Sequence, residues 1–263
     1  MAAANSRAER PAAAPRRRKG RGAAPYTLRE VYPLLADYYG EVEHRPRLPP
    51  IDELVWTILS QHTSDLNAGR AYDSLRARFP TWERVLAAPP DEVENAIRHG
   101  GLAAQKAPRI QSVLAAVRER TGGFDIAFLA ERPLAEAKEW LRSLPGVGPK
   151  TAAVVLSFSL GRPAFAVDTH IHRVARRLGL IGPKVSADAA HDILEDAIEP
   201  ERVFPAHVYL ITHGRRVCKA QRPLCGACVL AERCVERPDL EAKGLTARPG
   251  TGVPSPELAA KPL

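Results

Sequence analysis

The chain has 263 residues, of which 45% are hydrophobic, and this is enough apolar material for one large folded domain or two smaller ones. No stretch approaches the roughly 18 uninterrupted apolar residues of a membrane-spanning helix, and the N-terminal segment lacks the apolar core of a secretion signal. These features exclude a membrane protein and a secreted protein, so we expect a soluble protein that stays inside the cell.

Positive charge is concentrated at the N-terminus. Thirty-eight lysines and arginines against 30 acidic residues give a net charge of +8, which favours a polyanionic partner. Residues 1–25 carry seven basic groups and one acidic group, a net charge of +6, which leaves only +2 for the rest of the chain. Because this segment is rich in Ala, Pro, Arg and Gly and has no helical periodicity, we predict a disordered basic tail. Its role is open between an inert extension, a loose electrostatic hold on nucleic acid and an organelle transit peptide.

The folded part is predicted to be all-α. Apolar residues recur throughout the chain at the i, i+3, i+4, i+7 spacing of a helix face. Two clear examples are Ile51, Leu54, Val55 and Ile58, and Ile110, Val113, Leu114 and Val117. No alternating pattern typical of strands is found, and short Gly/Pro turns separate the helical segments. We expect about ten helices between residues 26 and 238, followed by a disordered Pro/Gly-rich tail over 239–263.

The four cysteines of the chain, Cys218, Cys225, Cys228 and Cys234, lie close together near the C-terminus. Disulfides are disfavoured in an intracellular protein with a large helical core, so four thiolates at a metal centre are the better interpretation. Zinc and a four-iron four-sulfur cluster both accept four sulfur ligands. Only one C-x-x-C pair is present, whereas zinc modules often have two, and this favours the cluster without excluding zinc.

A helix-hairpin-helix is predicted around "LPGVGPKTAAVV", residues 144–155. The segment "AEAKEWLRSL" forms the first helix, "PGVG" the connector and "PKTAAVVLSFSL" the second helix. The expected buried faces contain Leu141, Leu144, Val154, Val155 and Phe158. Gly146 and Gly148 permit backbone conformations in which peptide N–H groups approach a phosphate closely, so the hairpin suits binding to a DNA backbone. An ordinary helical hairpin with packing glycines is the alternative.

Lys150 and Asp168 are the candidate catalytic pair. Lys150 lies at the positive end of a helix dipole, where a positive environment and partial burial would lower the pKa of its amine, and a neutral amine is a nucleophile. Asp168, in "FAVDTHIHRV", is placed to cap a helix. Beside a nucleophilic amine, its carboxylate could also handle protons or stabilise positive charge on a sugar. We expect His170 and His172 to be surface or supporting groups.

Three features together, "LPGVGPKTAAVV", "VDTHIHRV" and the cysteine spacing, resemble the endonuclease III family of helix-hairpin-helix DNA glycosylases. The resemblance covers about residues 26–238. It implies two helical domains: a six-helix barrel over 48–162 that carries the hairpin, and an iron–sulfur domain assembled from 26–47 and 163–238. It also implies that Lys150 and Asp168 lie on opposite lips of one groove.

The function implied by this resemblance is that of a DNA glycosylase and AP lyase. Lys150 would attack C1′ of a deoxyribose that is flipped out of duplex DNA, displace an oxidised pyrimidine and cleave the strand 3′ to the lesion by β-elimination, with the assistance of Asp168. The four cysteines would hold a [4Fe-4S] cluster that shapes a DNA-binding surface and takes no part in catalysis.

Further DNA contacts follow from the same resemblance. The segment "LSQHTSD" resembles the loop that props the opposite strand, with Gln61 and His62 in it, and His62 stands where the family usually has glutamine. In "GGLAAQKA", Leu102 would fill the space left by the flipped base, although an apolar helix cap is the alternative. Lys219 and Arg222 fall in a cysteine loop that would touch phosphates, unless they are simply solvated charges.

Two competing functions remain at this stage. One is a glycosylase of the same fold that removes adenine opposite oxidised guanine, or mismatched uracil or thymine, but such relatives generally replace the lysine that stands at 150. The other is a non-catalytic DNA-binding module, for which neither Lys150 nor Asp168 is needed. We expect a monomer. Arginine outnumbers lysine 30 to 8, which suggests a GC-rich bacterial genome and a cytoplasmic protein associated with the nucleoid.

Overall fold

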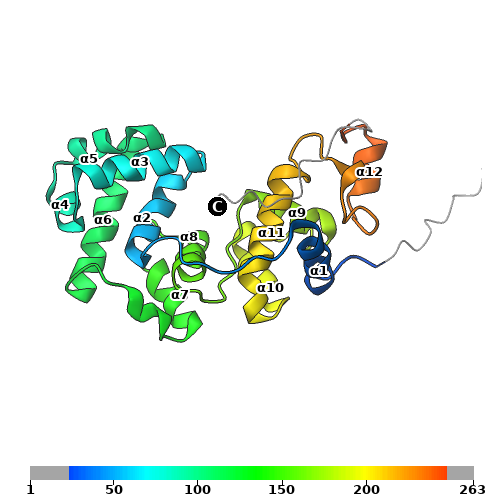
Figure 1. Cartoon of the computed structure of the whole chain (residues 1–263), viewed down its shortest axis with the longest axis horizontal. Coiled ribbons are helices and arrows are strands. Elements are labelled where there is room, and N and C mark those ends of the chain that lie inside the picture. The colour runs from blue at the N-terminus through cyan, green and yellow to red at the C-terminus, as the bar shows by residue number, and fades with distance from the viewer. Residues whose placement is uncertain (1–23, 248–263) are drawn as a thin grey trace, which may run out of the picture.

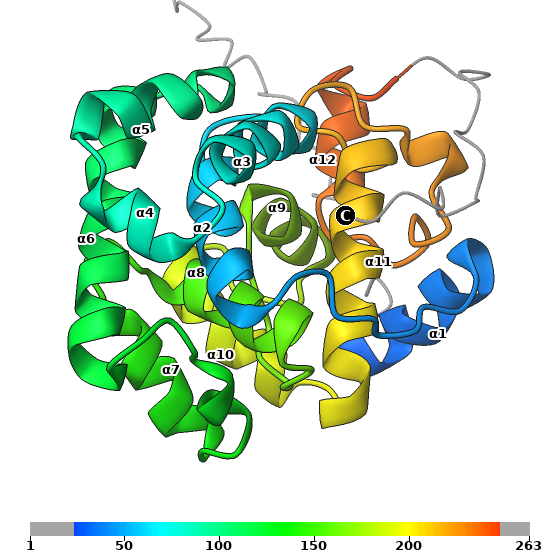
Figure 2. The same ribbon diagram turned by 60° about the vertical axis from the view of Figure 1, so that its left-hand side comes forward.

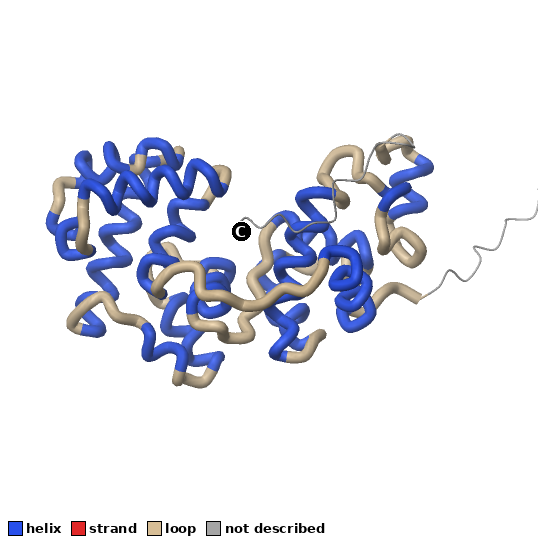
Figure 3. The backbone as a smooth tube through the Cα atoms, in the orientation of Figure 1, coloured by secondary structure: helices blue, strands red, loops and turns tan. Residues whose placement is uncertain are grey.

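The computed structural model describes residues 24–247, and within this range the protein is all-α, as predicted. Figure 3 shows helices joined by loops, and no strand among the described residues. Twelve α-helices and five shorter helical segments are present there, somewhat more than the ten expected. The predicted basic tail lies outside the described residues except for Ala24 and Pro25, whose carbonyls accept hydrogen bonds from Arg233. None of the described helices is long and apolar enough to span a membrane.

One apolar core lies within the helices from α2 to α8 (Figure 1). Their bounds are α2 Pro50–Ser60, α3 Asp65–Arg78, α4 Trp82–Ala87, α5 Pro90–Ala96, α6 Ala103–Thr121, α7 Leu134–Arg142 and α8 Pro149–Val154. The short segments η1 Arg98–Gly100 and η2 Ala127–Ala130 connect them, and the π-helical segment η3 Val155–Ser159 continues α8. Both periodic segments singled out in the sequence face this core: Leu54, Val55, Ile58, Ile110, Val113, Leu114 and Val117 are fully buried.

A second apolar core combines α1 with the C-terminal half of the chain (Figures 1 and 2). The helices are α1 Leu28–Tyr39, α9 Thr169–Leu178, α10 Ala187–Asp196, α11 Val203–Arg216 and α12 Arg237–Ala242, with η4 Pro200–Arg202 and η5 Cys225–Ala227 between them. Two tyrosine hydroxyls tie α1 to α11: Tyr39 lies 3.2 Å from His213 Nδ1, and Tyr209 donates to the Gly40 carbonyl at 2.8 Å. Residues far apart in sequence therefore share this core.

The two cores meet in the short segment before α9. Ala164 and Ala166 pack in the first core, whereas Phe165 and Val167 pack in the second. This alternation is that of an extended peptide, in which successive side chains point to opposite sides. It leads directly into Asp168, so the position of this carboxylate depends on both cores. The exact domain boundaries given above remain a prediction.

The predicted C-terminal tail begins too early. Residues 239–247 were expected to be disordered, but α12 extends to Ala242 and Leu240 is buried against the cysteine region. The Ala247 N–H then donates to the Pro223 carbonyl at 3.0 Å. The predicted boundary at residue 239 was based only on the Pro/Gly-rich composition of the segment. Burial of Leu240 in the lining of the cysteine pocket extends the folded region beyond that boundary.

Candidate active site

Lys150 and Asp168 line one pocket between the two cores, although 18 residues separate them in sequence. Lys150 comes from α8 and Asp168 from the start of α9. Trp56 and Ser60 of α2, together with His207 and Arg215 of α11, form other parts of the wall. The geometry therefore brings the predicted catalytic pair to one solvent-accessible site.

Lys150 is the second residue of α8, which begins at Pro149 directly after the hairpin connector. No carboxylate of residues 24–247 forms an ion pair with its amine, although Asp168 lines the same pocket. The partial burial expected for Lys150 is wrong, because the residue is exposed. Lys150 lies in the first turn of α8 and lines the pocket, where its amine can be reached from solvent.

Asp168 has a structural role and faces the pocket as well. It is the N-cap of α9, and its Oδ1 accepts the Ile171 N–H at 2.8 Å. The residue is half-buried, and no second hydrogen bond to its carboxylate is found among residues 24–247. One oxygen is thus used to order the helix, which leaves the other for the pocket.

His207 is a pocket residue that the sequence analysis missed. Its Nδ1 lies 2.7 Å from the Ala166 carbonyl, which can only accept, so Nδ1 carries the hydrogen and Nε2 is left as an acceptor. Burial lowers the pKa of this imidazole, while the Asp168 charge raises it and the Lys150 charge lowers it. Burial therefore favours the neutral imidazole of His207, which lines the same pocket as both candidate catalytic residues.

Arg47, from the connector between α1 and α2, lines one side of the pocket together with two aromatic rings. The Arg47 guanidinium lies over the Trp56 ring, 3.7 Å from its centroid, and 5.3 Å from that of Phe158. It also pairs with Glu53, which is fully buried in α2. Because this carboxylate is buried and paired, it fixes the guanidinium in place.

The hairpin forms as predicted, with two corrections. Leu141, Leu144, Val154, Val155 and Phe158 are all buried. However, the second helix changes from α to π geometry at Val155. Gly146 has a φ of +70°, and a Cβ added there would lie 3.0 Å from the Arg109 side chain, so a side chain there would be strained and crowded. Gly148 has an ordinary extended conformation, with φ −93°, and a Cβ added there would meet open space.

The four cysteines line a second pocket, which lies between α9, α11 and α12 and is walled by apolar side chains such as Val174 and Leu240. All four are free thiols. Burial raises the pKa of Cys225, Cys228 and Cys234, so stable thiolates there need a bound cation. Among the described residues, no group of three or more metal-ligating side chains is gathered as it would be around a single ion. Four thiols around one cavity supply the four sulfur ligands that either a zinc ion or an iron–sulfur cluster takes.

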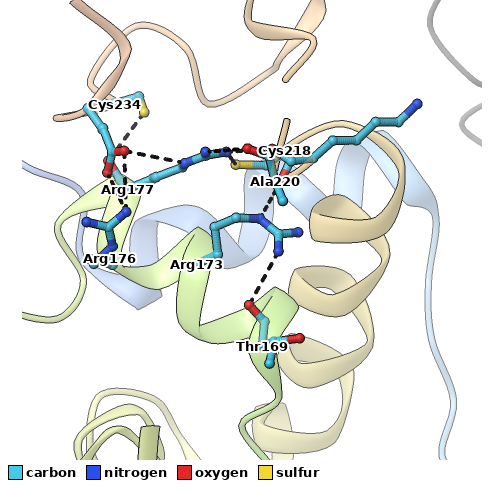
Figure 4. Close-up of polar contacts among 9 residues, drawn as sticks. Thr169, Arg173, Arg176, Arg177, Cys218, Ala220 and Cys234 are labelled. Carbon is cyan, nitrogen blue, oxygen red and sulfur yellow. Dashed lines mark hydrogen bonds and ion pairs between the residues drawn. The ribbon is translucent and has the colours of Figure 1, made fainter. Parts of the chain in front are cut away.

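Two arginines of α9 hold the cysteine loop, as Figure 4 shows. Arg177 donates to the carbonyls of Lys219 and Ala220 at 2.7 and 3.1 Å, and its Nη1 lies 3.5 Å from Cys218 Sγ. Arg173 donates to the Cys218 carbonyl at 3.0 Å. The helix that Asp168 caps is therefore also the helix that orders the cysteine loop.

Comparison with known protein families identifies the chain. Residues 55–200 match the profile of the HhH-GPD superfamily base excision DNA repair proteins, and residues 218–234 match the iron-sulfur binding domain of endonuclease III. The protein belongs to the endonuclease III family. Its cofactor is a [4Fe-4S] cluster, in agreement with the prediction and with the cavity that the four thiols surround.

Several endonuclease III proteins are similar over most of their length. That of Thermotoga maritima is 34% identical over 70% of this chain and 82% of its own length, and that of Bacillus subtilis is 36% identical over 76% and 87%. A protein of Arabidopsis thaliana, provisionally described as a DNA glycosylase, is 38% identical, but the chain spans only 56% of it. A solved non-covalent endonuclease III–DNA complex superposes with a TM-score of 0.70 at 32% identity, covering 82% of this chain and 99% of the other.

The remaining predicted DNA contacts lie on exposed loops of this endonuclease III family member. His62 follows α2 and is exposed with a φ of +55°, and Leu102 precedes α6, 46% exposed with a φ of +51°. Gln61 accepts a hydrogen bond from Arg109 at 2.8 Å. Lys219 and Arg222 are exposed on the cysteine loop. His172 contacts the Val185 carbonyl at 2.9 Å, and His170 accepts from Arg173 at 3.1 Å, which agrees with supporting roles.

Proposed function

We propose that the protein is a bifunctional DNA glycosylase and AP lyase that excises oxidised pyrimidines from duplex DNA and cleaves the strand 3′ to the abasic site. The observation that carries this proposal is the pocket that the Asp168 carboxylate shares with the exposed Lys150 amine, which forms no ion pair within residues 24–247. Non-catalytic binding of DNA needs neither group, whereas covalent chemistry at a sugar carbon needs a nucleophile such as this amine and is assisted by a nearby carboxylate.

The amine of Lys150 supplies the nucleophile. In its neutral form, Nζ bonds to C1′ while the bond to the base breaks, and the departing base carries the electron pair and takes up a proton. Nζ then loses a proton, and its lone pair breaks the bond from C1′ to the ring oxygen, which takes up a proton and stays on C4′ as a hydroxyl group, so that the opened sugar carries an iminium ion. This electron sink permits removal of a C2′ proton and departure of the 3′ phosphate, which is β-elimination. One amine therefore serves both base removal and strand cleavage.

Asp168 and the surrounding residues assist these steps. The Asp168 oxygen that does not cap α9 can stabilise positive charge on the sugar or accept a proton. The cluster, when bound in the cavity of Cys218, Cys225, Cys228 and Cys234, supplies structural cross-linking of the loop and no redox step.

Duplex DNA containing a damaged pyrimidine or an abasic site is the proposed partner. Gly146 and Gly148 would place peptide N–H groups against a phosphate, and Lys219 and Arg222 would add charge on the cysteine loop. Gln61 and His62 would face the opposite strand, and Leu102 would occupy the gap in the duplex. We further propose that the protein acts as a monomer in the cytoplasm of a bacterial cell, at the nucleoid.

The decisive experiment is borohydride trapping on duplexes with thymine glycol or an abasic site. Wild-type protein should excise the base, cleave the strand and give a covalent adduct, and Lys150→Gln should give no adduct. Lys184→Gln is the matched control, because Lys184 is exposed and is not among the residues that line the pocket, and it should behave as wild type. Trapping by Lys150→Gln would assign another nucleophile. DNA binding by wild-type protein without excision or cleavage would instead establish a non-catalytic module.

A further inference from the structure

Lys106 is a buried lysine, only 3% exposed, in the first turns of α6. Its amine donates to two backbone carbonyls, Leu59 at 2.7 Å and Gly100 at 2.8 Å. The first carbonyl is in the last turn of α2 and the second is at the end of η1. One ammonium group therefore joins the ends of two segments that lie about 40 residues apart in sequence.

The charge of Lys106 is costly where it stands. Burial disfavours an ammonium ion and lowers the pKa of this lysine, and the N-terminal turn of α6 is the positive end of a helix dipole. The two carbonyls offset this cost because each accepts a hydrogen bond from the ammonium group, and the Leu59 carbonyl also lies at the C-terminal, negative end of α2. An apolar side chain would avoid the desolvation cost, but it could not bind the carbonyls. Lys106 is therefore suited to fix a geometry.

Both segments continue into residues with unusual backbone conformations. His62 comes three residues after Leu59 and has a φ of +55°, and Leu102 comes two residues after Gly100 and has a φ of +51°. Left-handed residues other than glycine persist only where their surroundings determine them. The Lys106 backbone N–H also donates to the Leu102 carbonyl at 3.0 Å, so this residue orders the Leu102 turn twice.

The junction at which the ends of α2 and η1 meet Lys106 of α6 is tightly packed. A Cβ on Gly100 would lie 3.1 Å from Ala71 Cβ, so η1 packs tightly on α3. One turn after Lys106, Arg109 donates to Gln61 at 2.8 Å and packs against Gly146 of the hairpin. The N-terminal end of α6 thus contacts three of the segments proposed to touch DNA.

We propose that Lys106 is a positioning residue that holds the Gln61–His62 loop and the Leu102 loop in one fixed relationship, so that both enter a DNA duplex together. This inference rests on the proposed function. Both loops act on features that only a duplex has, namely an opposite strand and a stacked gap. Lys106 is not part of the lining of the pocket of Lys150 and Asp168, and the two meet only through Ser60, the pocket residue that follows Leu59. Lys106 is therefore needed for duplex substrates and dispensable for an abasic site in single-stranded DNA.

The test compares duplex and single-stranded substrates with the full-length, cluster-loaded protein. Lys106→Met should lower kcat/KM on a thymine-glycol duplex by about tenfold or more and change cleavage of a single-stranded abasic oligonucleotide by less than about twofold. Fluorescence of 2-aminopurine placed opposite the lesion should rise on binding of wild-type protein and not of the variant. Lys106→Arg retains the charge and should lie between the two.

A matched control separates positioning from general loosening of the fold. Val113→Ala removes a fully buried contact on the same helix, α6, without touching either carbonyl. It should lower the melting temperature and keep the wild-type ratio of duplex to single-strand cleavage. An equal loss on both substrates in Lys106→Met, or the same duplex-specific loss in Val113→Ala, would overturn the inference. Absence of all cleavage by wild-type protein would instead refute the proposed function on which it rests.

Discussion

Arg215 and Asp65 form an ion pair, with Arg215 Nη1 2.9 Å from Asp65 Oδ2, that joins α11 to the first residue of α3 beside the Lys150 pocket. The two residues are 150 positions apart in sequence. The helix of Asp65, α3, packs around the first core, and the helix of Arg215, α11, packs around the second. Both side chains are more than a third exposed, so the pair links the two halves of the protein at a surface that solvent, or a phosphate, can reach.

We expect substitutions of this pair to change DNA binding more than stability. An exposed ion pair contributes at most about 1 kcal/mol, so Asp65→Asn should leave the free energy of unfolding nearly unchanged. Arg215→Ala removes a cation beside the pocket and should weaken binding to an abasic-site duplex. The slope of log binding constant against log salt concentration should become smaller in magnitude by about one. Fluorescence anisotropy at several salt concentrations measures both effects. Equal loss of affinity in the two variants would show that the ion pair itself, and no phosphate contact, matters for binding.

Substitutions of Asp168 should distinguish its capping role in α9 from its chemical role in the pocket. Asparagine caps helices about as well as aspartate, so Asp168→Asn should lower the free energy of unfolding by less than about 1 kcal/mol. Removal of the carboxylate should nevertheless reduce base excision by about 100-fold. Single-turnover excision assays and urea unfolding give the two quantities.

The comparison with Asp168→Ala completes this test. Alanine removes the acceptor for the Ile171 N–H, so this variant should lose about 1 kcal/mol of stability in addition to activity. If Asp168→Asn retained wild-type excision, the residue would be a helix cap only.

His207 should make the protein sensitive to acid. Burial holds its pKa below the ordinary value of 6.5, so the folded protein keeps it neutral while the unfolded chain takes up a proton as the pH falls through 6.5. The stability present above that pH is then lost on acidification. The slope of unfolding free energy against pH is proportional to the number of protons taken up on unfolding. Between about pH 6.5 and about pH 5, His207→Gln should reduce this number by up to about one. Identical slopes in urea titrations of wild type and variant would contradict this expectation.

Loss of one cluster ligand should loosen the C-terminal region selectively. Cys228→Ser should abolish the visible absorbance of the cluster, because four thiolates are needed to hold it. Without the cluster, the cavity between the four cysteines is no longer filled, and Leu240 loses packing contacts there. We therefore expect loss of hydrogen-exchange protection in α12 and the cysteine loop. Protection in α6, in the other core, should stay as in wild type. Uniform loss throughout the protein would show that the cluster stabilises both cores.

Local motifs carried most of what could be predicted from the sequence. Lys150 and Asp168 lie within short patterns whose turn and cap residues determine the backbone around them. The cysteines are separated by a few residues each, so their gathering around one cavity needs little knowledge of the fold. The all-α class followed from periodicity for the same reason.

Residues that act through distant contacts were missed. His207 reaches a carbonyl 41 positions away, and Lys106 reaches one 47 positions away. In "GGLAAQKA", a lysine is expected to be a solvated residue of a helix surface, and nothing nearby marks it as buried. Arg47 is similar, because its aromatic partners Trp56 and Phe158 come from two different helical segments. Such roles depend on tertiary packing, which periodicity does not describe.

The alternation of residues 164–167 between the two cores limits how the protein can be divided. A cut before this peptide would take Ala164 and Ala166 from the first core, and a cut after it would take Phe165 and Val167 from the second. Fragments or chimaeras that are divided at this boundary would leave an internal void in one of the products, so we expect them to be less stable than the intact protein.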